Sequence, residues 1–231
     1  MIIMRPKTID RFKISYDKLF KLRSHFDKSL CLGAFVDILS GLSGLGKELM
    51  VSDTLKPYTM ITDFVTGKDL PDIGAEVNRQ AIERFLVEQK GYLKEDIQID
   101  ADIEMIVAGE LYRSQLDLVV SVDGGKTRFM AIKCVAGSLW SREREIVAAA
   151  RLLDNYQIPF SVVSDGKTAI VLDTVSGKKT GEGMNTIPSK KEAIEKLESL
   201  DLLPFPKDRL EREKLIFRTY DSENVNVQRN I

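Results

Sequence analysis

Histidine, cysteine and long apolar runs are scarce in this sequence, and each scarcity excludes a class of protein. His25 is the one histidine and lies in a charged helical run, where a surface position is expected, so neither a histidine-based catalytic triad nor a multi-histidine metal site is favoured. The two cysteines, Cys31 and Cys134, cannot make a disulfide framework and lack zinc-ligand spacing. No apolar run is long enough for a signal peptide or a bilayer span, which predicts a cytoplasmic protein with no membrane partner.

An excess of either charge is also missing. The 231 residues include 34 Lys and Arg against 35 Asp and Glu, for a formal net charge of -1. Binding to nucleic acid would therefore depend on a local patch rather than on the global field of the protein. An apolar fraction of 43% with 30% charged residues is typical of a soluble globular protein.

The residue patterns divide the chain into three parts. Residues 1–56 are predicted to be an N-terminal helical extension, residues 57–200 a core, and residues 201–231 a charged C-terminal tail with little capacity to bury itself. Within the extension, Gly41 to Lys47 imitates a phosphate-binding loop. Glu48 follows the lysine where that motif needs Ser or Thr to hold magnesium, so nucleotide binding is not favoured there.

The core alternates strand and helix signals. Strand–helix–strand succession favours an α/β (α+β) domain, with a mixed sheet flanked by helices. Apolar alternation predicts strands at residues 59–65, 97–107, 116–122, 128–135, 158–163 and 169–172, and helical periodicity predicts helices at 74–88, 141–153 and 190–200.

A predicted hairpin carries two charged residues in an otherwise apolar setting. Asp117 lies near the start of its first strand and Lys133 on its second, and Asp123-Gly124-Gly125 forms the turn. Charged groups are costly inside a sheet unless they face a solvated site. Two interpretations follow: metal-dependent phosphodiester chemistry, or the ordinary composition of an edge hairpin.

The order of these elements and their residues resembles the N-terminal nuclease domain of type I restriction enzyme R subunits, in the PD-(D/E)XK nuclease superfamily. The likeness covers roughly Ile61 to Leu200. The segments that carry it are Glu76-Val-Asn-Arg79-Gln80, Gly91-Tyr92, Leu116-Asp117-Leu118-Val119-Val120, Ala131-Ile132-Lys133, Arg151 to Phe160, and Ser164-Asp165-Gly166. The resemblance implies a restriction-endonuclease-like fold, DNA as partner and, in an active member, Mg²⁺-dependent phosphodiester hydrolysis.

The resemblance also assigns roles to individual residues. Asp117 corresponds to the central metal ligand, Glu76 to the acid on the first core helix, and Lys133 to the lysine that positions the attacking water. Ala131 stands where the second acid of the motif belongs. A methyl group cannot bind a metal, so the simplest expectation is a degenerate site.

Some restriction endonucleases of this superfamily take the missing acid from the following helix, which here offers Glu143 and Glu145. Glu143 shares a helix face with the apolar residues at spacings of three, four and seven, and is predicted to point inward. Glu145 lies about 200° around the helix from that face. The predicted catalytic set is therefore Asp117, Lys133, Glu76 and Glu143, with the three acids as metal ligands. The other interpretation is that Glu143 and Glu145 only interact with the N-terminus of their helix and with neighbouring arginines.

Two functions stay open at this level. One is a stand-alone nuclease that uses Mg²⁺, and the other is a catalytically inactive module, without a cofactor, that binds nucleic acid or assembles with protein. Trp140, before the 141–153 helix, either stacks on a base or packs over the end of the sheet. A second copy of the chain is a further candidate partner, and the residues indicate no particular restriction–modification subunit.

Overall fold

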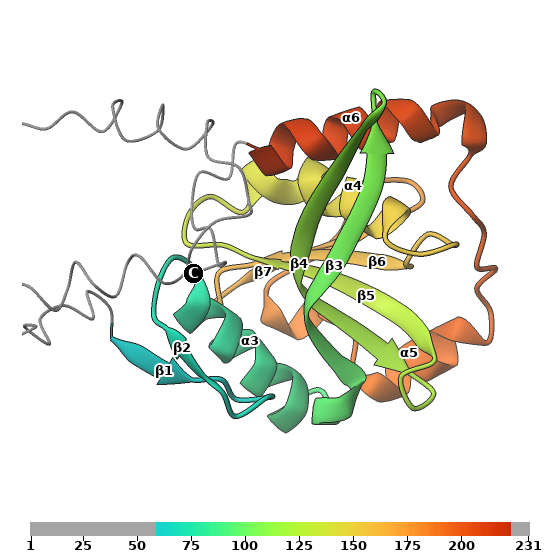
Figure 1. The fold of residues 1–231 in the computed structure, drawn as a ribbon. Coiled ribbons are helices and arrows are strands. Elements are labelled where there is room, and N and C mark those ends of the chain that lie inside the picture. Colours follow the sequence, from blue (N-terminus) through green and yellow to red (C-terminus); the bar gives the residue numbers. More distant parts are fainter. Residues whose placement is uncertain (1–58, 223–231) are drawn as a thin grey trace, which may run out of the picture. The chain divides into compact units, whose positions relative to one another are not determined.

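The computed structural model describes residues 59–222. The expected helical extension at 1–56, with its P-loop-like segment and with His25 and Cys31, lies outside these residues. The described part has a mixed β-sheet covered by helices on both faces (Figure 1). This confirms the expected mixed sheet flanked by helices.

Six strands form the main sheet in their sequence order, from β3 at one edge to β8 at the other. Neighbouring strands are antiparallel except β5 and β6, which are parallel and joined through helix α4. Strands β1 and β2 form a separate two-stranded ribbon. The strands are β1 Met60–Thr62, β2 Asp69–Pro71, β3 Ile97–Val107, β4 Glu110–Val122, β5 Thr127–Cys134, β6 Phe160–Ser164, β7 Ala169–Asp173 and β8 Lys178–Glu182. The sequence did not predict β2 and β8, because both are short and carry little apolar alternation.

Helices α3 and α5 lie on one face of the sheet, and α4 and α6 lie on the other (Figure 1). Alternation along β4 supplies both cores, since Leu118 packs with the α3 side and its neighbour Val119 packs with the α4 side. The helices are α3 Glu76–Glu88, α4 Glu143–Leu152, α5 Lys190–Leu197 and α6 Lys207–Ser222, with short 3₁₀ turns at Lys94–Asp96, Trp140–Arg142 and Met184–Thr186. None of the helices within residues 59–222 is long and apolar enough to cross a bilayer.

Helix α6 departs from the sequence expectation. The segment after residue 200 was expected to bury little, yet residues 207–222 form a helix whose Phe217 is buried in the α4-side core. Buried Glu213 accepts hydrogen bonds from Arg144 and Arg151 of α4. Glu213 therefore pairs with α4, whereas most other charged residues of this helix are exposed, and the expectation of little burial is wrong for Glu213 and Phe217.

Candidate active site

The β4–β5 hairpin brings Asp117 and Lys133 together. The strands pair Leu118 with Ile132, so the adjacent Asp117 and Lys133 lie opposite each other. The Lys133 ammonium is 3.9 Å from Asp117 Oδ2. Both strands are internal to the sheet, because β3 lies beyond β4 and β6 lies beyond β5. The interpretation as an ordinary edge hairpin is therefore wrong.

Asp117 is held in place by the backbone around it. The Cys134 backbone N–H donates a 2.7 Å hydrogen bond to Asp117 Oδ2. Pairing between β3 and β4 skips Asp100, whose φ of 49° interrupts the ladder beside Asp117. The register of β3 against β4 is the same on both sides of this interruption. The Cys134 thiol lies in the α3-side core.

Glu145, rather than Glu143, is the helix acid that reaches the hairpin. Glu145 Oε1 lies 3.2 Å from the Lys133 ammonium, and Glu145 is only 2% exposed. Arg142 Nη1 donates to the other carboxylate oxygen at 3.1 Å. Glu143 is half-buried, and its charge acts on Lys179 of β8 instead.

The expected direction of Glu143 is therefore wrong, for a physical reason. Helix α4 is buried from Ile146 to Ala150 on both sides, between the sheet and α6. Its apolar stripe consequently does not mark the face that meets the strands. A 3₁₀ turn at Trp140–Arg142 also precedes the helix and changes the path of the chain into it.

Ala131 occupies the position of the missing acid and is fully buried in the α4-side core. It pairs with Val119 on β4 and lies two residues before Lys133, on the same side of β5. Small side chains on α4, among them Ala148 and Ala149, belong to the same cluster. The helix thus packs close to the strand here, and Glu145 brings a carboxylate to the site from that helix.

Lys133 is charged despite its burial. Desolvation by itself would lower the pKa of Lys133, but the negative charges of Asp117 and Glu145 outweigh it and raise that pKa. Asp221, near the end of α6, acts in the same direction. The site therefore holds an ammonium ion among carboxylates at neutral pH.

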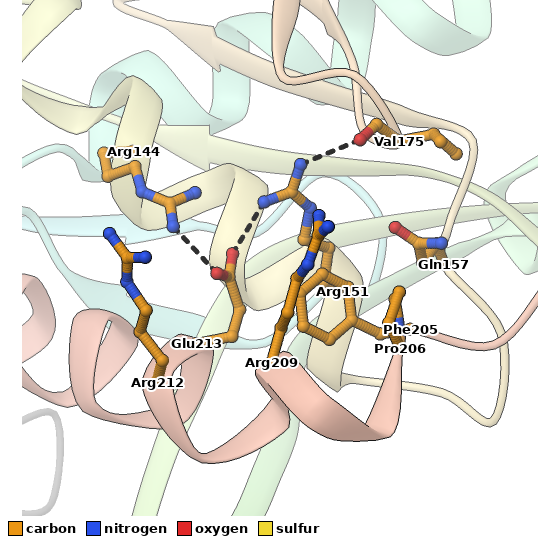
Figure 2. Close-up of a pocket in the computed structure, with 9 residues that line it drawn as sticks. All are labelled: Arg144, Arg151, Gln157, Val175, Phe205, Pro206, Arg209, Arg212 and Glu213. Atoms are coloured by element: carbon orange, nitrogen blue, oxygen red, sulfur yellow. Dashed lines mark hydrogen bonds and ion pairs between the residues drawn. The ribbon is translucent and has the colours of Figure 1, made fainter.

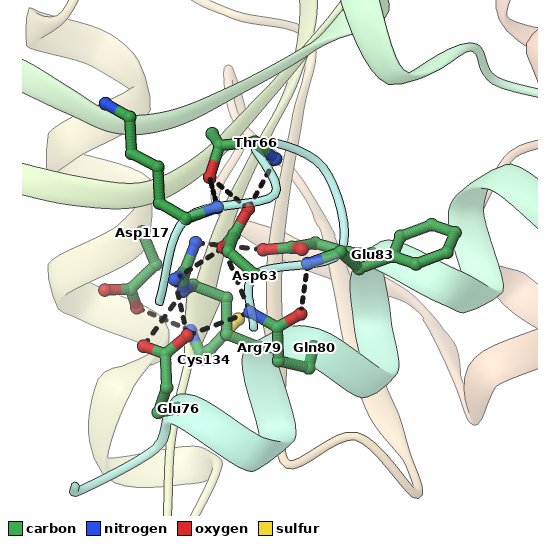
Figure 3. A network of polar contacts seen from close by, with 10 residues as sticks. Asp63, Thr66, Glu76, Arg79, Gln80, Glu83, Asp117 and Cys134 are labelled. Atoms are coloured by element: carbon green, nitrogen blue, oxygen red, sulfur yellow. Dashed lines mark hydrogen bonds and ion pairs between the residues drawn. The ribbon is translucent and has the colours of Figure 1, made fainter. Parts of the chain in front are cut away.

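Glu76, the acid on the first core helix, is part of a buried polar network (Figure 3). Arg79 donates to both Glu76 oxygens, at 2.5 and 3.2 Å, and Gln80 Nε2 donates at 3.0 Å. The same guanidinium pairs with Asp63 and Glu83, each at 2.9 Å. The guanidinium of Arg79 thus pairs with three buried acidic side chains, and Glu76 is one of them.

The pKa values of the two other acids in the network, Asp63 and Glu83, are shifted in opposite directions. Desolvation alone would raise the pKa of Asp63, but hydrogen bonds from Thr66 and Gln80 outweigh it and lower that pKa. For Glu83, desolvation dominates the opposing Arg79 charge and raises the pKa to about 7. Glu83 Oε2 has no hydrogen-bond partner within the described residues.

Two contacts fix the start of α3 against the sheet. Asn78 Nδ2 donates a 2.6 Å hydrogen bond to the Val135 carbonyl, just beyond β5. Gly166, in the β6–β7 turn with a φ of +82°, lies so close to α3 that a Cβ atom there would be 3.0 Å from the Ala81 Cβ. Only glycine suits both this conformation and this contact. The helix that carries Glu76 is therefore tied to the strand end that carries Lys133.

The C-terminal end of α6 also reaches this region, which the sequence did not indicate. Arg142 Nη1 donates to the Tyr220 carbonyl at 3.3 Å, and the Tyr112 hydroxyl donates to Asp221 Oδ2 at 2.5 Å.

Trp140 is 73% exposed, so the expectation that it packs over the sheet end is wrong. An exposed indole beside Arg142 leaves base stacking as its open interpretation.

Comparison with known proteins agrees with this architecture. Residues 74–188 match the family model described as type I restriction enzyme R protein N terminus. The described domain belongs to this family. A search of curated proteins gave no match, and a search of solved structures gave none either. The match to the R-protein N-terminal family spans α3, the hairpin and α4, and so includes every predicted site residue. It supports a restriction-endonuclease-like role.

The acids of this R-protein N-terminal domain do not form a ready-made metal cage. Within residues 59–222, no three His, Cys, Asp or Glu side chains are grouped so that they could hold a metal ion. Asp117 and Glu145 lie on either side of Lys133, and Glu76 is engaged by Arg79. Asp117, Lys133 and Glu145 thus lie together. Glu76 pairs with Arg79 instead, and the charge of Glu143 acts on Lys179.

Proposed function

We propose that this domain binds DNA and hydrolyses its phosphodiester bonds, with Asp117, Lys133 and Glu145 as the catalytic residues. The observation that carries the proposal is the contact between Glu145 of α4 and Lys133, 3.2 Å apart, beside Asp117. A carboxylate supplied by the helix replaces the acid that Ala131 cannot provide. The restriction-endonuclease-like family of the domain supports the same reaction class.

Lys133 is the central group in this proposal. Its ammonium, stabilised by two carboxylates, orients the attacking water and balances the negative charge that develops on the phosphate. Asp117, fixed by the Cys134 N–H, and Glu145, fixed by Arg142, set the position of that ammonium. Such preorganised charges act without reorganisation at the moment of reaction.

In this proposal Asp117 and Glu145, which pair with Lys133 in the structure, are the residues that would hold magnesium. Mg²⁺ in proteins is usually bound by one or two carboxylates together with water and substrate phosphate oxygens, and Asp117 and Glu145 provide two carboxylates. Bound Mg²⁺ would supply a Lewis acid that stabilises charge on the phosphate. Glu76 would join as a third ligand only on release from Arg79; otherwise its role is to position α3.

Trp140 provides the most direct support for DNA as the partner. Its side chain is 73% exposed, immediately before the helix that carries Glu145. Stacking of a base on an aromatic ring contributes about 1–3 kcal/mol and tolerates any sequence. A partner strand held by this indole would pass the Lys133 ammonium.

A second candidate is an inactive DNA-binding module, which the ion pairing of the acids favours. Glu145 pairs with Lys133 and Arg142, and Glu76 pairs with Arg79. A magnesium ion would have to displace these cations. In this candidate the charged cluster stabilises the fold and Trp140 carries the affinity for DNA.

Cleavage assays with matched variants separate the two candidates. Purified full-length protein is incubated with plasmid, duplex and single-stranded DNA in Mg²⁺ or Mn²⁺. We expect Glu145→Gln to lower the cleavage rate at least about 100-fold, the scale for removing one preorganised charge stabiliser. Glu143→Gln, on the same helix but away from Lys133, should keep wild-type activity.

Three results would count against the hydrolytic proposal. Cleavage that persists in Asp117→Asn would identify a contaminating nuclease. Equal losses in the Glu143→Gln and Glu145→Gln variants would contradict the assignment of Glu145. Tight DNA binding by the wild type, weakened by Trp140→Ala and without cleavage under any condition, would establish the inactive module instead.

A further inference from the structure

A pocket between α4 and α6 has arginine at four of its nine lining residues. Its volume is about 420 Å³, within the range of small-molecule sites. Figure 2 shows guanidinium groups from both helices around it, with one carboxylate between them. The residues that matter here are Arg144, Arg151, Phe205, Arg209, Arg212 and Glu213.

Two of the arginines are already used by the fold. Glu213, 4% exposed, accepts from Arg144 at 2.8 Å and from Arg151 at 2.9 Å. Arg151 also donates to the Thr174 and Val175 carbonyls, and its guanidinium lies 5.3 Å from the centre of the Phe205 ring. Both carboxylate oxygens of Glu213, the one acid that lines the pocket, are therefore hydrogen-bonded to arginine.

The other two arginines are not balanced in this way. Arg209 has an ion pair only with exposed Asp208 at 3.8 Å, and Arg212 has none within residues 59–222. The pocket therefore contains four guanidinium groups and one carboxylate, in a chain whose net charge is near zero. A concave surface lined by one sign of charge concentrates its field on an ion of the opposite sign.

We propose that this pocket binds phosphate groups, with Arg209 and Arg212 as the contacting residues. The planar guanidinium matches a phosphate in two-point hydrogen bonding, and four of them suit a ligand with more than one phosphate. The volume exceeds what one phosphate needs and admits a nucleoside polyphosphate. Two sources share this chemistry: a free nucleotide and the backbone of bound DNA.

The pocket is distinct from the candidate active site. Arg144 and Arg151 face Glu213 of α6, whereas Glu145 of α4 faces Lys133 on β5. Anion binding in the pocket therefore needs neither Lys133 nor a metal ion. The inference holds whether or not the domain hydrolyses DNA.

Titration calorimetry of the full-length protein, in EDTA at low salt, tests the proposal. Pyrophosphate, ATP and a short DNA duplex are the three probes. We expect at least one of them to bind, and the double variant Arg209→Gln/Arg212→Gln to lower its affinity at least tenfold. Arg113→Gln, at an exposed arginine that pairs with Glu104 and does not line the pocket, serves as the control and should bind as the wild type does.

The probes also separate the two sources. Binding of pyrophosphate or ATP that the double variant loses identifies a free nucleotide site, and loss restricted to the duplex identifies a DNA backbone contact. Far-ultraviolet circular dichroism verifies that the double variant is folded. Absence of binding by all three probes, or equal affinity in the wild type and the folded double variant, would overturn the proposal.

Discussion

Substitution of Glu83 by glutamine should abolish the loss of stability that this carboxyl group causes as pH rises from 4.5 to about 7. Glu83 is fully buried, and its pKa rises from 4.5 to about 7 on folding. Between these values the unfolded chain ionises this group while the folded chain keeps its proton, so stability falls as pH rises. At about 1.4 kcal/mol per pKa unit, the loss amounts to roughly 3 kcal/mol once pH exceeds 7.

Glutamine suits the site because its carbonyl oxygen can still accept from Arg79, and its amide replaces the Oε2 atom that lacks a partner among the described residues. Urea unfolding, followed by circular dichroism from pH 5 to pH 8, gives the free energy of unfolding for both proteins. We expect near-equal stability at pH 5 and a variant more stable than the wild type, by up to about 3 kcal/mol, at pH 8. Glu104→Gln, at an exposed ion pair, should follow the wild-type curve. A Glu83→Gln curve parallel to that of the wild type would refute the reasoning, because another group would then carry the dependence.

Three further substitutions test the buried core, the Arg79 network and a helix cap. Ala131→Glu restores the family acid in sequence, but it places a carboxylate in a fully buried apolar cluster; we expect destabilisation by several kcal/mol in urea unfolding and no gain in plasmid cleavage. Arg79→Met leaves three buried carboxylates without their cation and should cost about 3–5 kcal/mol by the same measurement; a loss below 1 kcal/mol would contradict the network. Ser189→Ala removes the side-chain acceptor at the start of α5 and should lower the unfolding free energy by about 1 kcal/mol, whereas an unchanged midpoint would show that the cap contributes nothing.

The sequence was sufficient to predict the elements whose signals are local. The Asp-Gly turn with its alternating flanks predicted the β4–β5 hairpin. Helical periodicity predicted the helix at 190–200, and α5 begins there at a capping box in which Ser189 and Glu192 each bond the other's backbone. Both features depend on residues close together in the chain. The opposition of Asp117 and Lys133 is not set by the turn alone, because the β4–β5 register shifts between Val120 and Ser121.

Features set by contacts between distant segments could not be predicted in this way. The face that α4 presents to β5 is one case, because α6 buries the opposite side of that helix and both sides are apolar. The placement of α6 is a second case, because Phe217 and the pairing of Glu213 with Arg144 and Arg151 join segments far apart in the chain. The polar network of α3 is a further case, because Asp63, which pairs with Arg79, comes from the loop between β1 and β2.

The charged pair on the hairpin is best explained by chemistry rather than by stability. Asp117 and Lys133 lie on internal strands, where desolvation of both ions costs several kcal/mol. Two apolar residues of similar volume often stabilise such a position equally well or better. Glu145 adds a third buried charge from a helix that is otherwise apolar over Ile146 to Ala150. A fold that only needed to be stable would gain by losing all three, so their assembly around one ammonium supports the catalytic role that we propose for them.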